Sequence, residues 1–196
     1  MEGSILRREI LPFIAIFAGL ILGALAVDLL LHHFDMVWLG RWLGIPGTLL
    51  ILTSFIYSLR KRKKIAFGKP KQLLAMHETL TWIGALMILV HAGVHIYTIL
   101  PWLALIAMLV NVISGMTGKY LLDSARRRLA EKANHYRAEG MSGESIERRL
   151  FWDATTVDAM KQWRVVHLPI TLAFAVLGLA HIVSIFLFWQ WQWQWQ

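Results

Sequence analysis

The feature that most constrains this chain is a series of five long apolar segments. Hydrophobic residues make up 57% of its 196 residues and charged residues only 16%, which is unlike an ordinary soluble domain. An apolar segment of about 20 residues is long enough to cross a bilayer as a helix. We therefore predict an all-α integral membrane protein with a single domain over residues 1–196. Its five transmembrane helices are expected at about 10–31, 43–59, 73–100, 102–122 and 165–189.

The connections between these spans carry turn signals. The sequence G-I-P-G at 44–47 is typical of a turn before the second span, and Pro101 indicates a tight hairpin between the third and fourth spans. Residues 123–162 form the one long polar loop, with two helical stretches on either side of a break at G-M-S-G. We expect spans two to five to form a four-helix bundle, beside one additional N-terminal helix.

The basic residues are distributed unevenly among these connections. Segments 1–9, 60–72 and 123–164, together with Lys119, hold 19 of the 20 Lys and Arg residues on one predicted side, and Arg41 lies on the other. Because cytoplasmic loops are enriched in Lys and Arg, the N-terminus and the loop 123–162 are predicted to be cytoplasmic and the C-terminus outside. This pattern explains the net charge of +8 by membrane topology rather than by nucleic-acid binding.

The C-terminal W-Q-W-Q-W-Q is then placed at the outer interface, where it predicts an aromatic belt. Its alternation also has strand periodicity, so pairing with a partner subunit is the alternative.

Several kinds of chemistry are excluded by the composition. The chain has no cysteine, which excludes iron–sulfur clusters, thiolate-ligated haem and covalent haem attachment. It also has no G-x-G-x-x-G and no G-K-[ST] loop, so flavin, nicotinamide or nucleotide chemistry would have to come from a partner.

Four histidines in apolar segments share one spacing. His77 and His91 are 14 residues apart in the third span, and His167 and His181 are 14 apart in the fifth. At 100° per residue, each pair lies on nearly one helix face and about 21 Å apart along the axis. Because the two spans are predicted to be parallel, His77 faces His167 near the inner surface and His91 faces His181 in the outer half.

Two imidazoles from facing helices are natural axial ligands for haem iron in a helix bundle. The spacing therefore predicts two haems, one above the other. The alternative is that these are buried histidines bonded to neighbouring helices, or proton-relay groups. Zinc is less well suited, because neither pair has the i, i+3 or i+4 spacing of a compact tetrahedral site.

Residues around the predicted ligands fit a flat cofactor. Gly84 lies midway between the two histidines of its span, and Gly178 lies close to the His167 face, so both are expected to leave room for a haem edge. Gly93 is expected to do the same at the outer level. Arg164, one turn before His167, is expected to pair with haem propionates.

Two further groups of polar residues leave alternatives open. His95 follows His91 by four residues and could replace it as the outer ligand; otherwise it is a propionate partner, a quinone ligand or an interface residue. Asp28 and His32 lie one turn apart at the same depth, and with His95 they predict a proton-releasing quinone site, the alternative being an ordinary interfacial hydrogen-bonded pair. Glu78 either pairs with a basic residue of the inner loops or has a proton-coupled role beside the inner haem.

The H-x13-H motif on two helices of a four-helix core resembles the dihaem cytochromes b. This superfamily includes the membrane core of ferric reductases and NADPH oxidases and the N-terminal half of the bc-complex cytochrome b. The resemblance covers roughly residues 43–189. It implies two haem b groups, ligated at His77, His91, His167 and His181, that pass electrons across the membrane.

The expected function is therefore electron transfer between a quinone pool and a partner redox protein. The chain would be the membrane subunit of a respiratory or photosynthetic oxidoreductase in an energy-transducing inner membrane, with no catalytic side chain of its own. One alternative is a ferric- or oxygen-reductase module fed by a separate cytoplasmic reductase. A second alternative is a non-redox, proton-conducting or structural membrane subunit.

Overall fold

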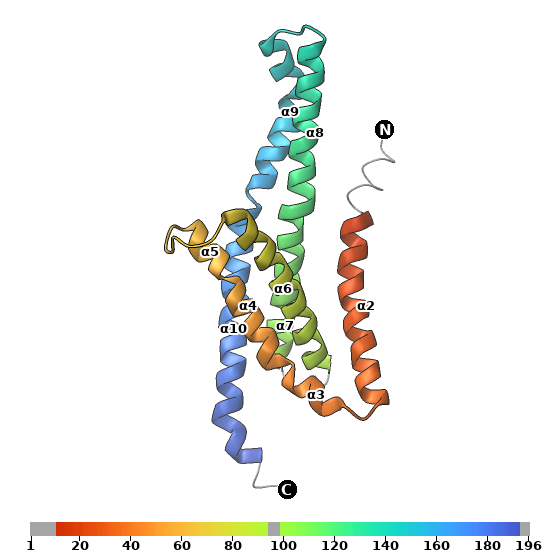
Figure 1. Cartoon of the computed structure of the whole chain (residues 1–196), viewed down its shortest axis with the longest axis vertical. Helices are drawn as coiled ribbons and strands as arrows, with labels where there is room; N and C mark the ends of the chain where they lie inside the picture. Colours follow the sequence, from red (N-terminus) through yellow and green to blue (C-terminus); the bar gives the residue numbers. More distant parts are fainter. Residues whose placement is uncertain (1–10, 94–98, 193–196) are drawn as a thin grey trace.

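A computed structural model of the chain describes residues 11–93 and 99–192 (Figure 1). Every regular element in this part is a helix, as predicted. In chain order the elements are α2 (Leu11–His33), α3 (Val37–Trp42), α4 (Gly44–Ser54), α5 (Ile56–Lys61), α6 (Pro70–Gly93), α7 (Ile99–Met116), the π-helix η2 (Thr117–Leu121), α8 (Leu122–Ala138), α9 (Gly143–Lys161) and α10 (Trp163–Gln192).

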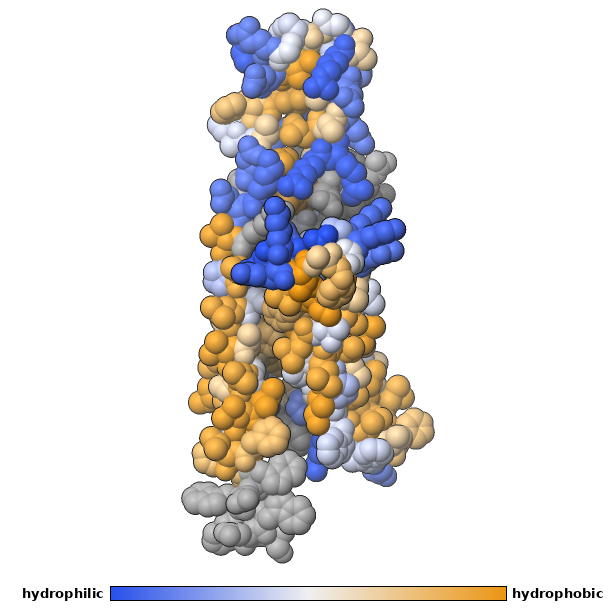
Figure 2. Space-filling model, turned by 60° about the vertical axis from the view of Figure 1, so that its left-hand side comes forward, coloured by the Kyte–Doolittle hydropathy of each residue, from blue (hydrophilic) through white to orange (hydrophobic). Residues whose placement is uncertain are grey.

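Five segments of this part are long and apolar enough to cross a membrane. They are Leu11–His33, Val37–Lys61, Pro70–Gly93, Ile99–Met116 and Val165–Phe188. Figure 2 shows apolar side chains gathered along one half of the molecule and polar side chains along the other. For the described residues, the prediction of an all-helical chain with five helices long and apolar enough to cross a membrane is confirmed.

The second span is longer than predicted and has no turn at 44–47. It extends from Val37 to Lys61 as three short consecutive helices, and G-I-P-G forms the first turn of α4. Proline is tolerated there because its missing N–H would have no partner inside the helix. The prediction of a turn at this sequence was wrong for that reason.

The boundary between the third and fourth spans also differs from the prediction. In the described residues α6 ends at Gly93, and Ile99 and Leu100, which were assigned to the third span, belong to α7. Pro101 therefore lies in the first turn of α7 rather than at a hairpin. As at G-I-P-G, the proline marks the beginning of a helix and not a turn between two helices.

The fourth span does not end in a loop. The chain continues from α7 through η2 directly into α8, so that one helical rod extends beyond the apolar half of the molecule (Figure 1). α8 and α9 then pack on each other as a hairpin, with Ile146 and Leu150 buried. The predicted break is confirmed between Ala138 and Gly143, where Gly140 has φ +78.

The membrane helices pack mainly as two antiparallel pairs. α4 lies against α6, α10 lies against α7, and α2 covers another side of α6 (Figure 1). Leu20, Ala85 and Met108 form a buried cluster where α2, α6 and α7 meet. α6 and α10 run in the same direction, so the two helices that carry the histidine pairs are parallel, as predicted.

Candidate functional site

The structure places the two residues of the predicted inner pair on two parallel helices (Figure 1). His77 in α6 and His167 in α10 lie toward the same end of their helices, and both are half-buried. Their rings are near enough for a charge on one to act on the other.

Each of these rings is held through Nδ1 by a neighbouring helix. His77 Nδ1 donates a hydrogen bond of 3.1 Å to the backbone carbonyl of Ser54, which is the last residue of α4. His167 Nδ1 is 3.2 Å from the hydroxyl oxygen of Ser114 in α7. Thr171, one turn after His167, donates to Asn111 Oδ1 at 2.7 Å and fixes α10 against α7. Both antiparallel pairs thus orient one histidine each.

This arrangement bears on which ring nitrogen carries the proton. A carbonyl oxygen can only accept, so the neutral His77 ring carries its proton on Nδ1 and has a lone pair on Nε2. The Ser114 hydroxyl can donate or accept, and it supports the same tautomer of His167 when it accepts. A metal-binding histidine is typically held in this way, with the second nitrogen bonded to a carbonyl or another polar group.

The outer pair is arranged differently. His91 packs against α4 at Gly44, where an added Cβ would lie 2.9 Å from Cγ, Cδ2 and Nε2 of the ring. Such a distance leaves no space for a side chain, so the His91 ring can occupy this position only because residue 44 is a glycine. His181 lies half-buried in α10, 14 residues after His167. Beside it, a Cβ at Gly178 would meet nothing within 4 Å.

Gly84 has a different role from the one predicted. An added Cβ would lie 2.9 Å from the backbone oxygen of Gly47 and 2.8 Å from Ile51 Cγ1, both in α4. The space beside Gly84 is therefore occupied by the neighbouring helix and not left for a haem edge. Small residues at such a crossing let two membrane helices approach closely, and this is how α4 packs on α6.

Asp28 and His32 lie together at the end of α2. The His32 ring nitrogen Nδ1 is 2.8 Å from the backbone oxygen of Asp28 and 3.6 Å from its carboxylate oxygen Oδ1. That oxygen is buried and has no hydrogen-bond partner among the described residues. An added Cβ on Gly93 would lie 3.2 Å from it, so Asp28 fills the space expected to be left open at Gly93.

Two predicted site residues cannot be placed in this way. His95 lies outside the described residues, and so does the side chain of Arg164, whose backbone is in the first turn of α10. Within the described part, no group of three or more His, Cys, Asp or Glu side chains comes together as a metal cluster would. The candidate site therefore consists of the two predicted histidine pairs.

Sequence reasoning missed the residues that orient the inner histidines. Ser54 is almost fully buried, and Ser114 and Asn111 lie one turn apart in α7. The available signal was the presence of isolated polar residues inside apolar spans, where each needs a partner.

Comparisons with protein-family models, with curated proteins and with solved structures found no match. The functional argument therefore depends on the geometry of the chain itself.

Proposed function

We propose that this chain is a dihaem b-type cytochrome that carries electrons across a membrane between a quinone pool and a partner redox protein. The observation that carries the proposal is the orientation of His77 and His167. The two imidazoles come from parallel helices (Figure 1), and a neighbouring helix engages Nδ1 of each ring. In the proposal, Nε2 of each ring takes one of the two axial positions of one haem iron.

The residues present fit such a group. A partner on Nδ1 fixes the ring orientation and makes Nε2 a better ligand, and its loss typically weakens metal binding 10–100-fold. The haem, when bound, supplies one-electron chemistry at its iron. The protein contributes the rotation of the two rings, the spacing of the helices and an apolar surrounding that limits access of water.

The second pair extends the proposal across the membrane. His91 and His181 follow the inner histidines by 14 residues each, which is about 21 Å along a helix. They are proposed to ligate the outer haem, with His95 as the alternative to His91. Gly178 would leave room for an edge of that haem, and Arg164 would pair with propionates at the inner level.

The orientation of the protein is part of the same proposal. The connection between α5 and α6 and the α8–α9 hairpin, which carry most of the Lys and Arg residues, lie toward the same end of the molecule (Figures 1 and 2). By the positive-inside rule this end faces the cytoplasm. We place the chain in an energy-transducing inner membrane as the membrane subunit of a larger oxidoreductase, where its apolar helices contact lipid.

The test is a reduced-minus-oxidised absorption spectrum of the full chain, expressed with haem available and purified in detergent. We expect a b-type band from two haems per chain. His167→Ala and His181→Ala are each expected to remove one haem and to retain the other. His135→Ala is the matched control, because His135 is exposed in the α8–α9 hairpin and pairs with Glu139.

Two results would contradict the proposal. A wild-type chain without a b-type band would favour the non-redox membrane subunit. Haems that are present but are not reduced by a quinol would favour a ferric- or oxygen-reducing module fed from the cytoplasm.

A further inference from the structure

The connection between α5 and α6 is strongly basic. Residues 60–71 read R-K-R-K-K-I-A-F-G-K-P-K and contain seven Lys or Arg and no Asp or Glu. Every residue of this segment is exposed except Arg60 and Ile65, which are half-buried. The segment joins the second span, which ends at Lys61, to the third, which begins at Pro70. Its charges are therefore held directly at the ends of two apolar helices.

This connection is folded by its own backbone hydrogen bonds. α5 ends in a Schellman turn, in which the Lys64 N–H donates to the Leu59 carbonyl at 3.0 Å. In the same turn the Lys63 N–H donates to the Arg60 carbonyl at 3.1 Å. Arg60 Nε in turn donates to the carbonyl of Gly68 at 3.2 Å, across the connection. The basic side chains therefore project from a loop of defined shape.

Lys63 occupies a position that usually belongs to glycine. Its φ of 57° lies in the left-handed region, which a Cβ makes less favourable. At this position of a Schellman turn the common residues are glycine and asparagine. Because glycine would be the more stable choice for the backbone, the lysine is a reason to look for a use of its charge.

An apolar ring lies among these charges. Phe67 is 60% exposed. Its ring is less stable in water than at the boundary between lipid headgroups and acyl chains. The connection projects to one side of the bundle (Figure 1), and Figure 2, which brings this side forward, shows hydrophilic side chains where the apolar half ends. With the apolar half in a bilayer, the ring and the charges therefore lie at the level of the headgroups.

The α8–α9 hairpin also carries basic residues, but it differs in two respects. Residues 122–161 hold eight Lys or Arg and seven Asp or Glu, so the positive and negative charges nearly cancel. Lys132 pairs with Asp153, and Arg148 pairs with Glu144. The hairpin also extends away from the apolar half (Figure 1). An anionic membrane surface is therefore attracted more strongly to the α5–α6 connection than to the hairpin.

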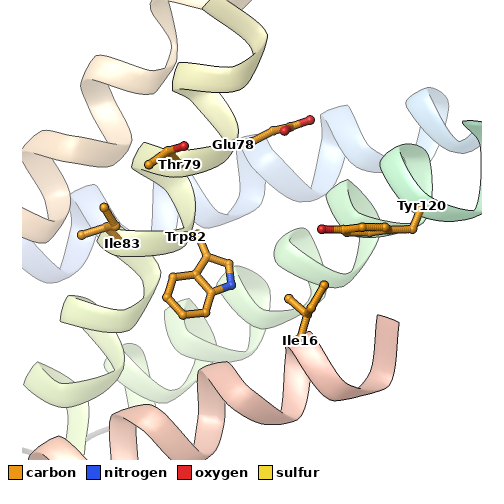
Figure 3. A pocket seen from close by; sticks show the side chains of 6 residues that line it. All are labelled: Ile16, Glu78, Thr79, Trp82, Ile83 and Tyr120. Atoms are coloured by element: carbon orange, nitrogen blue, oxygen red, sulfur yellow. The ribbon is translucent and has the colours of Figure 1, made fainter. Parts of the chain in front are cut away.

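A groove between α2, α6 and η2 offers a comparison within the apolar half. It has a volume of about 310 Å³ and is lined by Ile16, Glu78, Thr79, Trp82, Ile83 and Tyr120 (Figure 3). The lining is mainly apolar and aromatic, and its Glu78 carboxylate repels an anion. The groove therefore provides a reference position that is expected to contact lipid without attracting negative charge.

We propose that the α5–α6 connection binds the anionic phospholipid headgroups of the leaflet on its side of the membrane, with Phe67 inserted beside the acyl chains. The exposed Lys and Arg side chains contact the lipid phosphates, and their apolar stems lie along the membrane surface. An acidic protein domain would match the same charges. The exposed ring at the end of the apolar half favours the lipid, because a bilayer covers that ring and an acidic surface does not.

The first experiment measures the preference for headgroup charge. The full chain is reconstituted in phosphatidylcholine vesicles that contain a trace of photoactivatable lipid, either phosphatidylglycerol or phosphatidylcholine with a diazirine beside the headgroup. Labelled peptides are identified by mass spectrometry. On peptides from residues 60–71 we expect at least about fivefold more label from phosphatidylglycerol. Lys63→Gln, Lys64→Gln and Lys69→Gln, combined in one chain, are expected to lower this ratio below about twofold.

The matched control removes the same number of positive charges from the α8–α9 hairpin. Lys132→Gln, Arg137→Gln and Arg148→Gln, combined in one chain, are expected to retain the preference at residues 60–71, because these exposed residues lie in α8 and α9 beyond the apolar half. A rise in ionic strength should weaken the preference of the wild-type chain, since salt screens exposed charges.

The second experiment locates residue 67 and leaves the lysines unchanged. Because the chain has no cysteine, Phe67→Cys carries a nitroxide label at a single position. Electron paramagnetic resonance compares collisions of the label with oxygen, which dissolves in the bilayer, and with a water-soluble nickel chelate. In vesicles that contain phosphatidylglycerol we expect oxygen to be the more effective at residue 67, as at Ile16→Cys in the groove. At Ser142→Cys, in the exposed turn of the hairpin, we expect the nickel chelate to be the more effective.

Three results would overturn the lipid site. The first is equal labelling of residues 60–71 by the two lipids in the wild-type chain. The second is a preference that the hairpin variant loses and the connection variant retains. The third is a label at residue 67 that meets the nickel chelate as freely as Ser142→Cys does, which would favour an acidic protein partner. Neither experiment requires haem, so the absence of a b-type band would contradict the proposed function alone.

Discussion

The Ser114 hydroxyl is expected to set the affinity of the inner haem through His167. Ser114→Ala removes the hydroxyl that lies against His167 Nδ1, while the carbonyl that holds His77 belongs to the backbone and is not altered. Loss of such a partner costs 10–100-fold in metal affinity. The distance of 3.2 Å is at the long limit of the normal hydrogen-bond range, so we expect the lower value. That is about tenfold, or about 1.4 kcal/mol.

The assay is a titration of the haem-free chain with haemin, followed by absorbance, together with electron paramagnetic resonance of the oxidised form. Ser114→Ala should weaken one of two haem-binding steps and shift one of two low-spin signals, leaving the other signal unchanged. Thr117→Val is the matched control, because its hydroxyl donates to the backbone oxygen of Ile113, one turn earlier in the same helical rod. The reasoning would be refuted if Ser114→Ala bound both haems with the affinity of the wild type, or if Thr117→Val lost as much haem affinity as Ser114→Ala.

Three further predictions concern helix contacts. Gly44→Ala would place a Cβ 2.9 Å from three atoms of the His91 ring, so the outer haem should bind at least about tenfold more weakly, measured by the same titration. Gly84→Ala would meet the α4 backbone at 2.9 Å and should lower the free energy of unfolding by about 1–3 kcal/mol. Thr171→Val removes the hydrogen bond to Asn111 and should cost about 0.6 kcal/mol, both measured by unfolding in mixed micelles.

A common control applies to both glycine variants. A Cβ at Gly19 would meet nothing within 4 Å, so Gly19→Ala is expected to change neither stability nor haem binding appreciably. If Gly84→Ala is as stable as Gly19→Ala, the close contact between α4 and α6 does not determine stability. If Gly44→Ala retains the outer haem at full affinity, then His91 does not bind that haem from its position against α4. A change of more than about 2 kcal/mol for Thr171→Val would contradict a single interhelical hydrogen bond.

Proline and glycine account for the places where the fold was predicted incorrectly. Pro46 and Pro101 were interpreted as turn residues, but both lie in the first turn of a helix. A tight turn and the first turn of a helix both accept a residue that has no backbone N–H. The presence of proline in the sequence therefore does not distinguish a turn from a helix start. The role of Gly84 was also missed. A glycine in the sequence indicates space beside the helix, but it does not indicate whether a cofactor or a neighbouring helix such as α4 fills that space.

The sequence by itself determined the number of apolar helices and the parallel course of the two that carry the histidine pairs. Span length, charge distribution and the 14-residue spacing are properties of each segment, set by bilayer thickness and by the helical repeat. Only the tertiary structure decided how each helix is rotated about its axis. That rotation turns His77 and Gly84 toward α4 and gives His167 its contact with Ser114. The physical reason is that such contacts join residues far apart in the chain, and their geometry depends on the packing of whole helices.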